Sequence, residues 1–169
     1  MSVPAHRIRL VPIFADIITQ HHGAFDSLLD LGCGELHAVW RQRWGTKYEG
    51  LDIRDSVGAD YVGDACDLSM LPTNSRDVVT GWSILEHVTH PYNMLTEAKR
   101  VSRGTVILST DFTQYDKNYD NTHLYSWTIK TLTQLVKKIH PDSRVYANGG
   151  SDPMLIVVMC RCYEDWMDI

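Results

Sequence analysis

The chain has 169 residues, of which 44% are apolar and 22% are charged, and its 16 basic and 21 acidic side chains give a formal net charge of −5. This composition is typical of a globular protein and excludes intrinsic disorder and a fibrous repeat. The length favours one domain spanning 1–169, large enough to fold without a disulfide or metal staple.

Neither a membrane span nor a secretory signal is predicted. The chain contains no run of 18 apolar residues, and its N-terminus lacks the continuous apolar stretch of a signal peptide. Its four cysteines include no Cys-x-x-Cys pair. This spacing disfavours a disulfide framework and favours a reducing compartment, so we expect a cytoplasmic protein.

Apolar periodicity predicts helices and strands that alternate through most of the chain. The first helix lies within 7–20, where apolar residues follow helical spacing, and the other helices cover 36–43, 91–103 and 127–139. Short apolar runs predict strands at 27–31, 48–53, 60–64, 77–81, 105–109, 143–147 and 154–160.

Punctuating residues set the expected helix ends. Pro91 suits a first helical turn and Gly104 a C-terminal stop. Ser126 is expected to cap the following helix, and Pro141 lies beyond its end. The polar and aromatic stretch 111–125 is predicted to be a long loop, and the turn-rich 148–153 joins the last two strands.

The alternation of elements predicts an α/β fold. Because the early strands are apolar throughout, they are typical of a mainly parallel sheet covered by helices on both faces. The last two strands are expected to form an antiparallel hairpin.

The residues that follow each predicted strand are candidates for ligand binding, since open α/β sheets bind ligands at the carboxyl ends of their strands. Asp30, Gly32 and Gly34 lie around the end of the first strand, and the glycines allow a tight turn. Asp52 ends the second strand, 20 residues after Gly32, where an acid can accept both hydroxyls of a ribose. Asp64 follows the third strand and could accept from an exocyclic amine.

Two classes of cofactor use this arrangement. A dinucleotide site requires a third glycine or alanine in the loop for close packing of helix on strand, but that position is His37. This disfavours NAD and an oxidoreductase. A phosphate-binding P-loop is also absent from the sequence.

Four motifs occur in order along the chain. They are Leu28-Leu-Asp-Leu-Gly-Cys-Gly, Gly50-Leu-Asp-Ile, Gly63-Asp-Ala-Cys-Asp-Leu, and Asp77-Val-Val-Thr-Gly-Trp-Ser-Ile-Leu-Glu-His-Val, the last followed by Glu97-Ala-Lys-Arg-Val. These motifs resemble those of class I S-adenosylmethionine-dependent methyltransferases, which have a Rossmann-like fold. Within that class the chain is most similar to the small-molecule branch that includes the ubiquinone- and menaquinone-biosynthesis enzymes.

The resemblance implies roles in holding S-adenosylmethionine and its product S-adenosylhomocysteine. The loop after the first strand would hold the methionine part, Asp52 the ribose, and later residues the adenine and the methyl end. The implied cofactor-binding residues are Asp30, Gly32, Cys33, Gly34, Asp52, Ile53, Asp64, Ala65, Gly81 and Trp82.

Two departures from the family pattern stand out. Leu36 replaces the last glycine of the loop, which predicts a different fit around the cofactor. Asp52 and Asp64 are 12 positions apart, so the usual helix between their strands is expected to be short or missing and the adenine edge open.

The expected reaction is an in-line displacement, in which alignment of nucleophile and methyl group can supply roughly 7–11 kcal/mol. A hydroxyl nucleophile also benefits from a base, and His87 and His123 are the candidates. In some related O-methyltransferases a Glu-His pair like Glu86-His87 helps to hold a cation, together with a Glu at the position of Ser83. With only two such ligands present, no metal site is expected.

A small molecule is the expected methyl acceptor. The acidic charge and the absence of a basic stripe disfavour nucleic acid, and the motifs of amino- and cytosine-methylating DNA enzymes do not occur. A non-catalytic module of methyltransferase-like fold remains the alternative. The sequence leaves the acceptor, the need for a base and the oligomeric state open.

Overall fold

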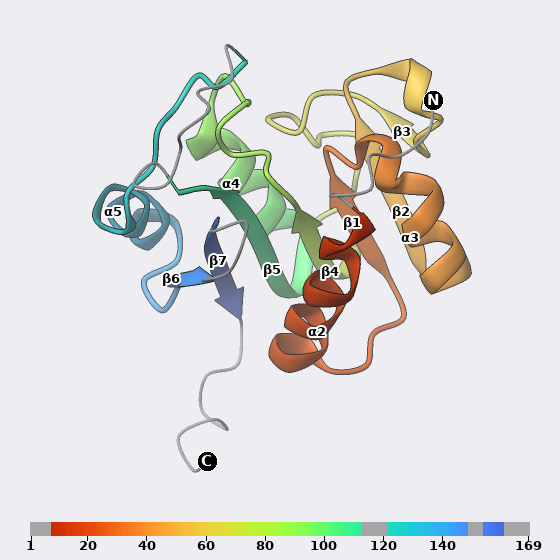
Figure 1. Ribbon diagram of the computed structural model, residues 1–169, viewed down its shortest axis with the longest axis horizontal. Coiled ribbons are helices and arrows are strands. Elements are labelled where there is room, and N and C mark those ends of the chain that lie inside the picture. Colours follow the sequence, from red (N-terminus) through yellow and green to blue (C-terminus); the bar gives the residue numbers. More distant parts are fainter. Residues whose placement is uncertain (1–7, 113–121, 149–153, 161–169) are drawn as a thin grey trace.

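The computed structural model describes residues 8–112, 122–148 and 154–160, which form a seven-stranded sheet of order β3-β2-β1-β4-β5-β7-β6 (Figure 1). The strands are β1 (Leu28–Leu31), β2 (Tyr48–Asp52), β3 (Tyr61–Val62), β4 (Arg76–Gly81), β5 (Ser102–Asp111), β6 (Arg144–Asn148) and β7 (Met154–Cys160). The first five are parallel, while β7 is antiparallel to both β5 and β6. The predicted Rossmann-like sheet with its C-terminal antiparallel hairpin is therefore confirmed.

Helices cover both faces of the sheet. The helices are α2 (Leu10–His22), α3 (His37–Trp44), α4 (Pro91–Val101) and α5 (Ile129–Ile139). Buried residues of α4 and α5 belong to one apolar cluster, and those of α2 and α3 belong to a second cluster on the opposite face. The sheet is thus buried between two helical layers, as its apolar strands predict.

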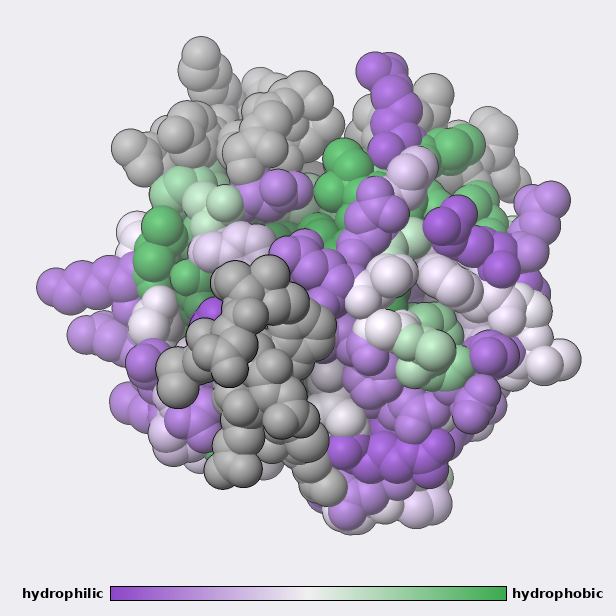
Figure 2. Space-filling view, turned by 90° about the horizontal axis from the view of Figure 1, so that it is seen from below, coloured by the Kyte–Doolittle hydropathy of each residue, from purple (hydrophilic) through white to green (hydrophobic). Residues whose placement is uncertain are grey.

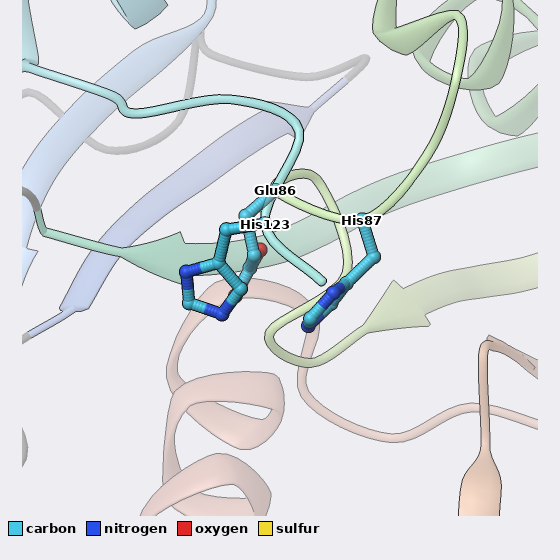
Figure 3. A group of neighbouring side chains, drawn as sticks. All are labelled: Glu86, His87 and His123. Atoms are coloured by element: carbon cyan, nitrogen blue, oxygen red, sulfur yellow. The ribbon is translucent and has the colours of Figure 1, made fainter. Parts of the chain in front are cut away.

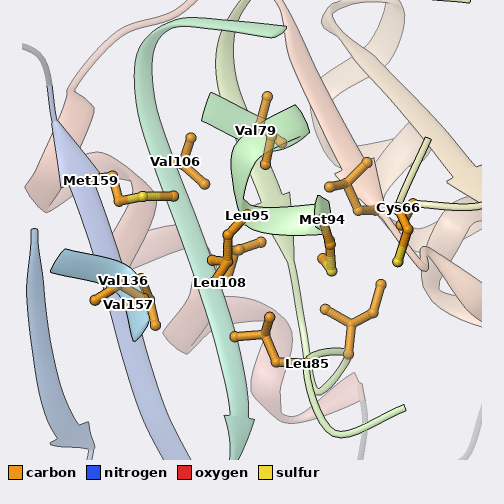
Figure 4. Packing of buried hydrophobic residues seen from close by; sticks show 14 of the residues in the cluster. Cys66, Val79, Leu85, Met94, Leu95, Val106, Leu108, Val136, Val157 and Met159 are labelled. Carbon is orange, nitrogen blue, oxygen red and sulfur yellow. The ribbon is translucent and has the colours of Figure 1, made fainter. Parts of the chain in front are cut away.

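The larger cluster joins β4, β5 and β7 to α4 and α5 (Figure 4). Burial of a large aliphatic side chain contributes about 1.5–3 kcal/mol, so this cluster is a main source of stability. Its fully buried members include Val79, Met94, Leu95, Val106, Leu108, Val136 and Val157.

Helix α4 ends earlier than predicted, and the proposed stop at Gly104 is wrong. The helix ends at Val101, and Gly104 lies inside β5. A Cβ atom there would lie 2.6 Å from the backbone oxygen of Asp77 and 2.5 Å from the His22 ring. The glycine therefore permits close packing of α2 against β4 and β5 rather than ending a helix.

The predicted cap of α5 is also wrong. The helix begins at Ile129, and Thr128 caps it by accepting from the Thr131 N–H at 3.2 Å, in a reciprocal capping box. Trp127 is buried and pairs with Phe112 in an isolated bridge, which keeps it out of the helix. Most of the predicted loop 111–125 and of the turn 148–153 lies outside the described residues.

The connection from β2 to β3 contains no α-helix. It holds only the short 3₁₀ turn η3 (Asp55–Val57), and two similar turns, η1 (Gly34–Leu36) and η2 (Gly45–Lys47), flank α3. The short spacing of Asp52 and Asp64 predicted that the usual helix would be short or missing here, and this prediction is confirmed.

Asp30 is a buried carboxyl in the middle of the sheet. It is 2% exposed and accepts hydrogen bonds from the Thr80 hydroxyl at 2.8 Å and the Tyr48 hydroxyl at 3.2 Å. Burial raises the pKa of Asp30 to about 7, and the two hydroxyls counter only part of that rise. The folded protein therefore holds a proton on Asp30 that the unfolded chain releases at much lower pH.

The described surface seen in Figure 2 is mostly hydrophilic, with apolar residues gathered in a smaller part of it. Among the described helices, none is both long and apolar enough to cross a membrane.

We expect Gly104→Ala to lower the free energy of unfolding by about 1–3 kcal/mol, the usual range for overpacking, because the Asp77 oxygen is backbone and cannot swing away. Urea unfolding measures the change. Adding His22→Ala should recover little of the loss. Full recovery in that double variant would show that the side chain, not the backbone, sets the packing limit.

We expect Asp30→Asn to gain stability relative to the wild type as pH rises. The raised pKa of Asp30 means that its favourable contribution is complete below about pH 4 and is lost as pH rises toward 7. Between pH 5 and 8 the difference in unfolding free energy should shift by about 2 kcal/mol in favour of the variant. Asp16→Asn, on the exposed side of α2, is the control; equal pH dependence of Asp30→Asn and wild type would contradict the prediction.

Candidate functional site

A pocket of about 840 Å³ lies at the carboxyl ends of β1, β2 and β4. This is the edge of the sheet at which a ligand is expected in this fold, and the volume is that of a small-molecule site. The sequence-predicted residues that line it are Gly32, Gly34, Asp52, Ile53, Asp64, Ala65, Trp82 and His87.

The loop after β1 is fixed against β2. The backbone N–H groups of Gly32 and Cys33 both donate to the Leu51 oxygen, at 2.8 and 3.1 Å. Gly32 has φ +67°, and a Cβ atom on it would lie 2.5 Å from Ile84 Cδ1. Glycine is therefore favoured there by the backbone conformation, and a larger residue would also have to displace the Ile84 side chain.

Close packing of α3 on the sheet uses a glycine on the strand. The dinucleotide pattern uses a third glycine in the loop for this packing, but His37 stands there in this chain. A Cβ atom on Gly50 of β2 would lie 2.6 Å from His37 Nδ1 and 2.8 Å from Cys33 Sγ. The space that the helix needs is supplied by its partner strand.

Asp52 is the best-connected side chain of the pocket. Its Oδ2 accepts from the Gly34 N–H at 2.9 Å, and its Oδ1 accepts from the Arg54 backbone N–H at 2.9 Å and from Arg54 Nε at 3.1 Å. Burial alone would raise the pKa of Asp52, but these hydrogen bonds outweigh it and hold the pKa below its ordinary value. Asp52 is thus an ionised acceptor near neutral pH.

The Asp52 carboxylate has about four acceptor positions, and three are occupied. A ribose diol needs two of them, so Arg54 Nε must leave for both hydroxyls to bind. The Arg54 side chain is half-exposed and also contacts Glu35 at 3.3 Å. Because the Arg54 side chain is half-exposed, its guanidinium group can move into solvent when a ligand binds, whereas the buried Asp52 stays in place.

The far end of the pocket is formed by the segments after β2 and β3. Asp64 Oδ1 accepts from the Cys66 N–H at 2.8 Å, an interaction that turns the chain and fixes the carboxylate. Ile53 is 71% exposed beside it. Because η3 replaces a helix here, an apolar side chain lies uncovered at the pocket edge.

Three of the predicted cofactor-binding residues do not line the pocket. Asp30 faces Tyr48 and Thr80 inside the sheet, as described above. Cys33 is buried against Gly50 of β2, and a Cβ atom on Gly81 would meet Leu108 and Ile84. These three residues are therefore packed inside the protein and do not line the pocket.

Trp82 forms one wall of the pocket beyond β4. Its ring stacks on Phe14 of α2, with centroids 3.8 Å apart and planes 6° from parallel. Both residues are buried. The N-terminal helix therefore fixes the orientation of a side chain that reaches the pocket.

Glu86, His87 and His123 come together beside the pocket (Figure 3). One possible ligand atom from each lies within 4.8 Å of the others, and the two histidine rings meet edge to face with centroids 4.8 Å apart. His87 lines the pocket directly, whereas His123 lies next to the lining residue Thr122. The two predicted catalytic histidines are thus neighbours.

Hydrogen bonds hold the segment of His123 against the segment of His87. The N–H groups of Leu124 and Tyr125 donate to the backbone carbonyl oxygen of Glu86 at 2.7 and 3.3 Å. The Tyr125 hydroxyl donates to the backbone carbonyl oxygen of Thr89 at 2.9 Å. Trp127 Nε1 donates to the Leu85 oxygen at 3.4 Å. Two segments far apart in sequence are thereby joined at the pocket.

Sequence reasoning missed several residues of the pocket. Glu35 and Arg54 line the pocket and form an ion pair beside Asp52. The position of Arg54, two residues after Asp52, could have indicated that it contacts the same carboxylate. Ser83 lines it with φ +49°, and its N–H donates to Ser109 Oγ at 2.8 Å. That conformation depends on β5 and left no signal in the sequence.

Comparison with known proteins identifies the domain. Residues 29–109 match the family described as the methyltransferase domain. No curated protein matches the chain.

Solved structures share the fold. An S-adenosylmethionine-dependent methyltransferase from Archaeoglobus fulgidus is 14% identical with a TM-score of 0.73, and the match covers 90% of this chain and 94% of that one. A putative methyltransferase from an antibiotic biosynthesis pathway of Anabaena variabilis is 19% identical with a TM-score of 0.66, covering 83% and 64%. A putative methyltransferase of Haloferax volcanii, in complex with the activator Trm112, is 15% identical with a TM-score of 0.62, covering 91% and 96%.

The family match, the motifs in order and the seven-stranded sheet agree with one another. Residues 29–109 are therefore a methyltransferase domain, and the fold of the chain is that of S-adenosylmethionine-dependent methyltransferases.

Proposed function

We propose that the protein transfers a methyl group from S-adenosylmethionine to an oxygen or nitrogen atom of a small molecule. The observation that carries this proposal is the pocket of about 840 Å³, which extends from Asp52 and Asp64 to Trp82 and His87. A nucleoside cofactor and a small acceptor can share a pocket of this size. The likeness to the ubiquinone-biosynthesis branch remains a prediction from the motifs.

The chemistry of the lining residues fits the cofactor. Asp52 accepts the ribose hydroxyls once Arg54 Nε moves away, and Gly32 leaves the space that a side chain would fill. Asp64 accepts from the adenine amine, while Ile53 covers one face of the adenine ring and Ala65 lies beside it.

The methyl group is then expected to lie at the Trp82 end of the pocket. Trp82, held by Phe14, aligns the sulfonium with the acceptor, and alignment alone can supply roughly 7–11 kcal/mol. His87 and His123 act on the nucleophilic atom of the acceptor, since both are close to this end. Help in removing a proton is worth about 100–10,000-fold for a hydroxyl nucleophile.

A small acceptor is favoured over nucleic acid by charge. The net charge is −5, and a phosphate backbone requires a basic surface for binding. We also propose that 1–169 acts as one domain in the cytoplasm, where cysteines stay reduced. The free thiols of Cys33 and Cys66 support that location.

Removing the Asp52 carboxylate should weaken binding of S-adenosylhomocysteine by about 10- to 100-fold, because hydrogen bonds to a charged group contribute about 1.5–3 kcal/mol. Calorimetric titration of Asp52→Ala against the wild type measures this. Asp67→Ala is the control, since Asp67 is exposed and does not line the pocket. Wild-type affinity in Asp52→Ala, or no binding by the wild type, would overturn the proposed cofactor-binding site.

Methyl transfer should label small molecules. We would incubate the protein with methyl-labelled S-adenosylmethionine and three fractions of a cell extract, namely dialysable metabolites, RNA and protein. Label should appear in the metabolites and should fall with Asp52→Ala. Label confined to RNA or protein would contradict the proposed acceptor class, and no label in any fraction would favour the non-catalytic module.

A further inference from the structure

We propose that Glu86, His87 and His123 bind one divalent transition-metal ion at the acceptor end of the pocket. Each of the three side chains offers one possible ligand atom, and these three atoms all lie within 4.8 Å of one another. Two imidazoles and one carboxylate form a donor set that binds such ions, with coordination positions left open.

The cluster must contract to bind an ion. Ligand atoms at about 2.1 Å from one tetrahedral ion lie about 3.4 Å apart. The observed spacing of up to 4.8 Å therefore requires the ligand atoms to approach one another by up to about 1.4 Å. Rotation about the side-chain bonds of the two histidines can supply such a shift without backbone movement.

Glu86 gives independent support for a cation. The residue is 1% exposed, and its Oε1 accepts from the Asp111 N–H at 3.3 Å. Its Oε2 has no well-directed hydrogen-bond partner among the described residues, although the Thr110 hydroxyl lies beside the carboxyl group. A buried carboxylate oxygen without a partner is costly and calls for an explanation. A bound cation would satisfy that oxygen and balance its charge.

The surroundings also orient both histidines. His87 Nδ1 lies 3.3 Å from the backbone carbonyl oxygen of Thr122. If Nδ1 donates its proton to that oxygen, the lone pair on Nε2 is available for a metal. Asp111 Oδ2 lies 3.8 Å from His123 Nε2. A carboxylate beside a histidine ligand is a common second partner in metal sites and raises the basicity of the ring.

The kind of ion follows from the ligands. Mg²⁺ and Ca²⁺ prefer oxygen ligands, whereas two imidazoles favour Mn²⁺, Fe²⁺, Co²⁺ or Zn²⁺. The sequence disfavoured a metal because Ser83 stands where some relatives have glutamate. In the structure the third ligand comes instead from His123, which is 36 positions after His87.

A bound ion would change how the two histidines act. Because His87 lines the pocket, an ion held there could bind the acceptor hydroxyl and lower the pKa of that hydroxyl. This role rests on the proposed function, but binding of the ion itself does not. Metal binding and cofactor binding can therefore be tested separately.

The test is titration of the purified protein with Co²⁺, followed by its visible absorption bands and by calorimetry in the absence of cofactor. We expect one equivalent to bind. Glu86→Gln, His87→Ala and His123→Ala should each weaken binding by at least about tenfold, while His90→Ala, an exposed histidine three residues from His87, should not. Melting curves and binding of S-adenosylhomocysteine establish that each variant is folded.

No bound Co²⁺ in the wild type, or equal binding by the wild type and the three variants, would overturn the metal site. Once an acceptor is known, a chelator should lower methyl transfer and added Mn²⁺ should restore it. If the wild type keeps full activity in the presence of the chelator while His87→Ala loses activity, the metal has no role in the reaction. The histidines would then act as bases. Failure of the wild type to bind S-adenosylhomocysteine would instead count against the proposed function.

Discussion

The site depends on one hydrogen bond, from the Gly34 N–H to the Asp52 carboxylate. It joins the loop after β1 to the end of β2, next to the two N–H groups that donate to the Leu51 oxygen. The same carboxylate is kept ionised by the N–H groups of Gly34 and Arg54 and by the Arg54 side chain. One residue therefore sets both the shape of the loop and the charge of the pocket, so loss of Asp52 would affect loop and ligand together.

The fold was largely predictable because its signals are local. Apolar runs and helical spacing report which segments face a core, and the sheet confirms them. The errors occurred where a distant contact decides the outcome. Gly104 has the residue type of a helix stop, yet its place is set by Asp77 and His22. Trp127 was assigned to a helix, but its bridge to Phe112 keeps it extended.

The pocket was predictable only in part, for the same reason. Strand ends and motif spacing brought Gly32, Asp52 and Asp64 to one edge. Asp30 shares their motif, but side chains alternate along a strand, so it faces the α2 side of the sheet with Tyr48 and Thr80. The approach of His123 to His87 depends on hydrogen bonds across 36 positions of sequence, which no local pattern reports.

The two ends of the pocket differ in how firmly they are held. At the adenine end a 3₁₀ turn stands in place of a helix, and Ile53 is 71% exposed. At the acceptor end Trp82 is stacked on Phe14, and the segment 122–127 is hydrogen-bonded to the segment 85–89. Catalysis by alignment needs rigidity where the reacting atoms meet, whereas the adenine needs only affinity. The preorganised end is therefore the one at which the proposed chemistry requires precision, and the open end can tolerate the loss of a helix.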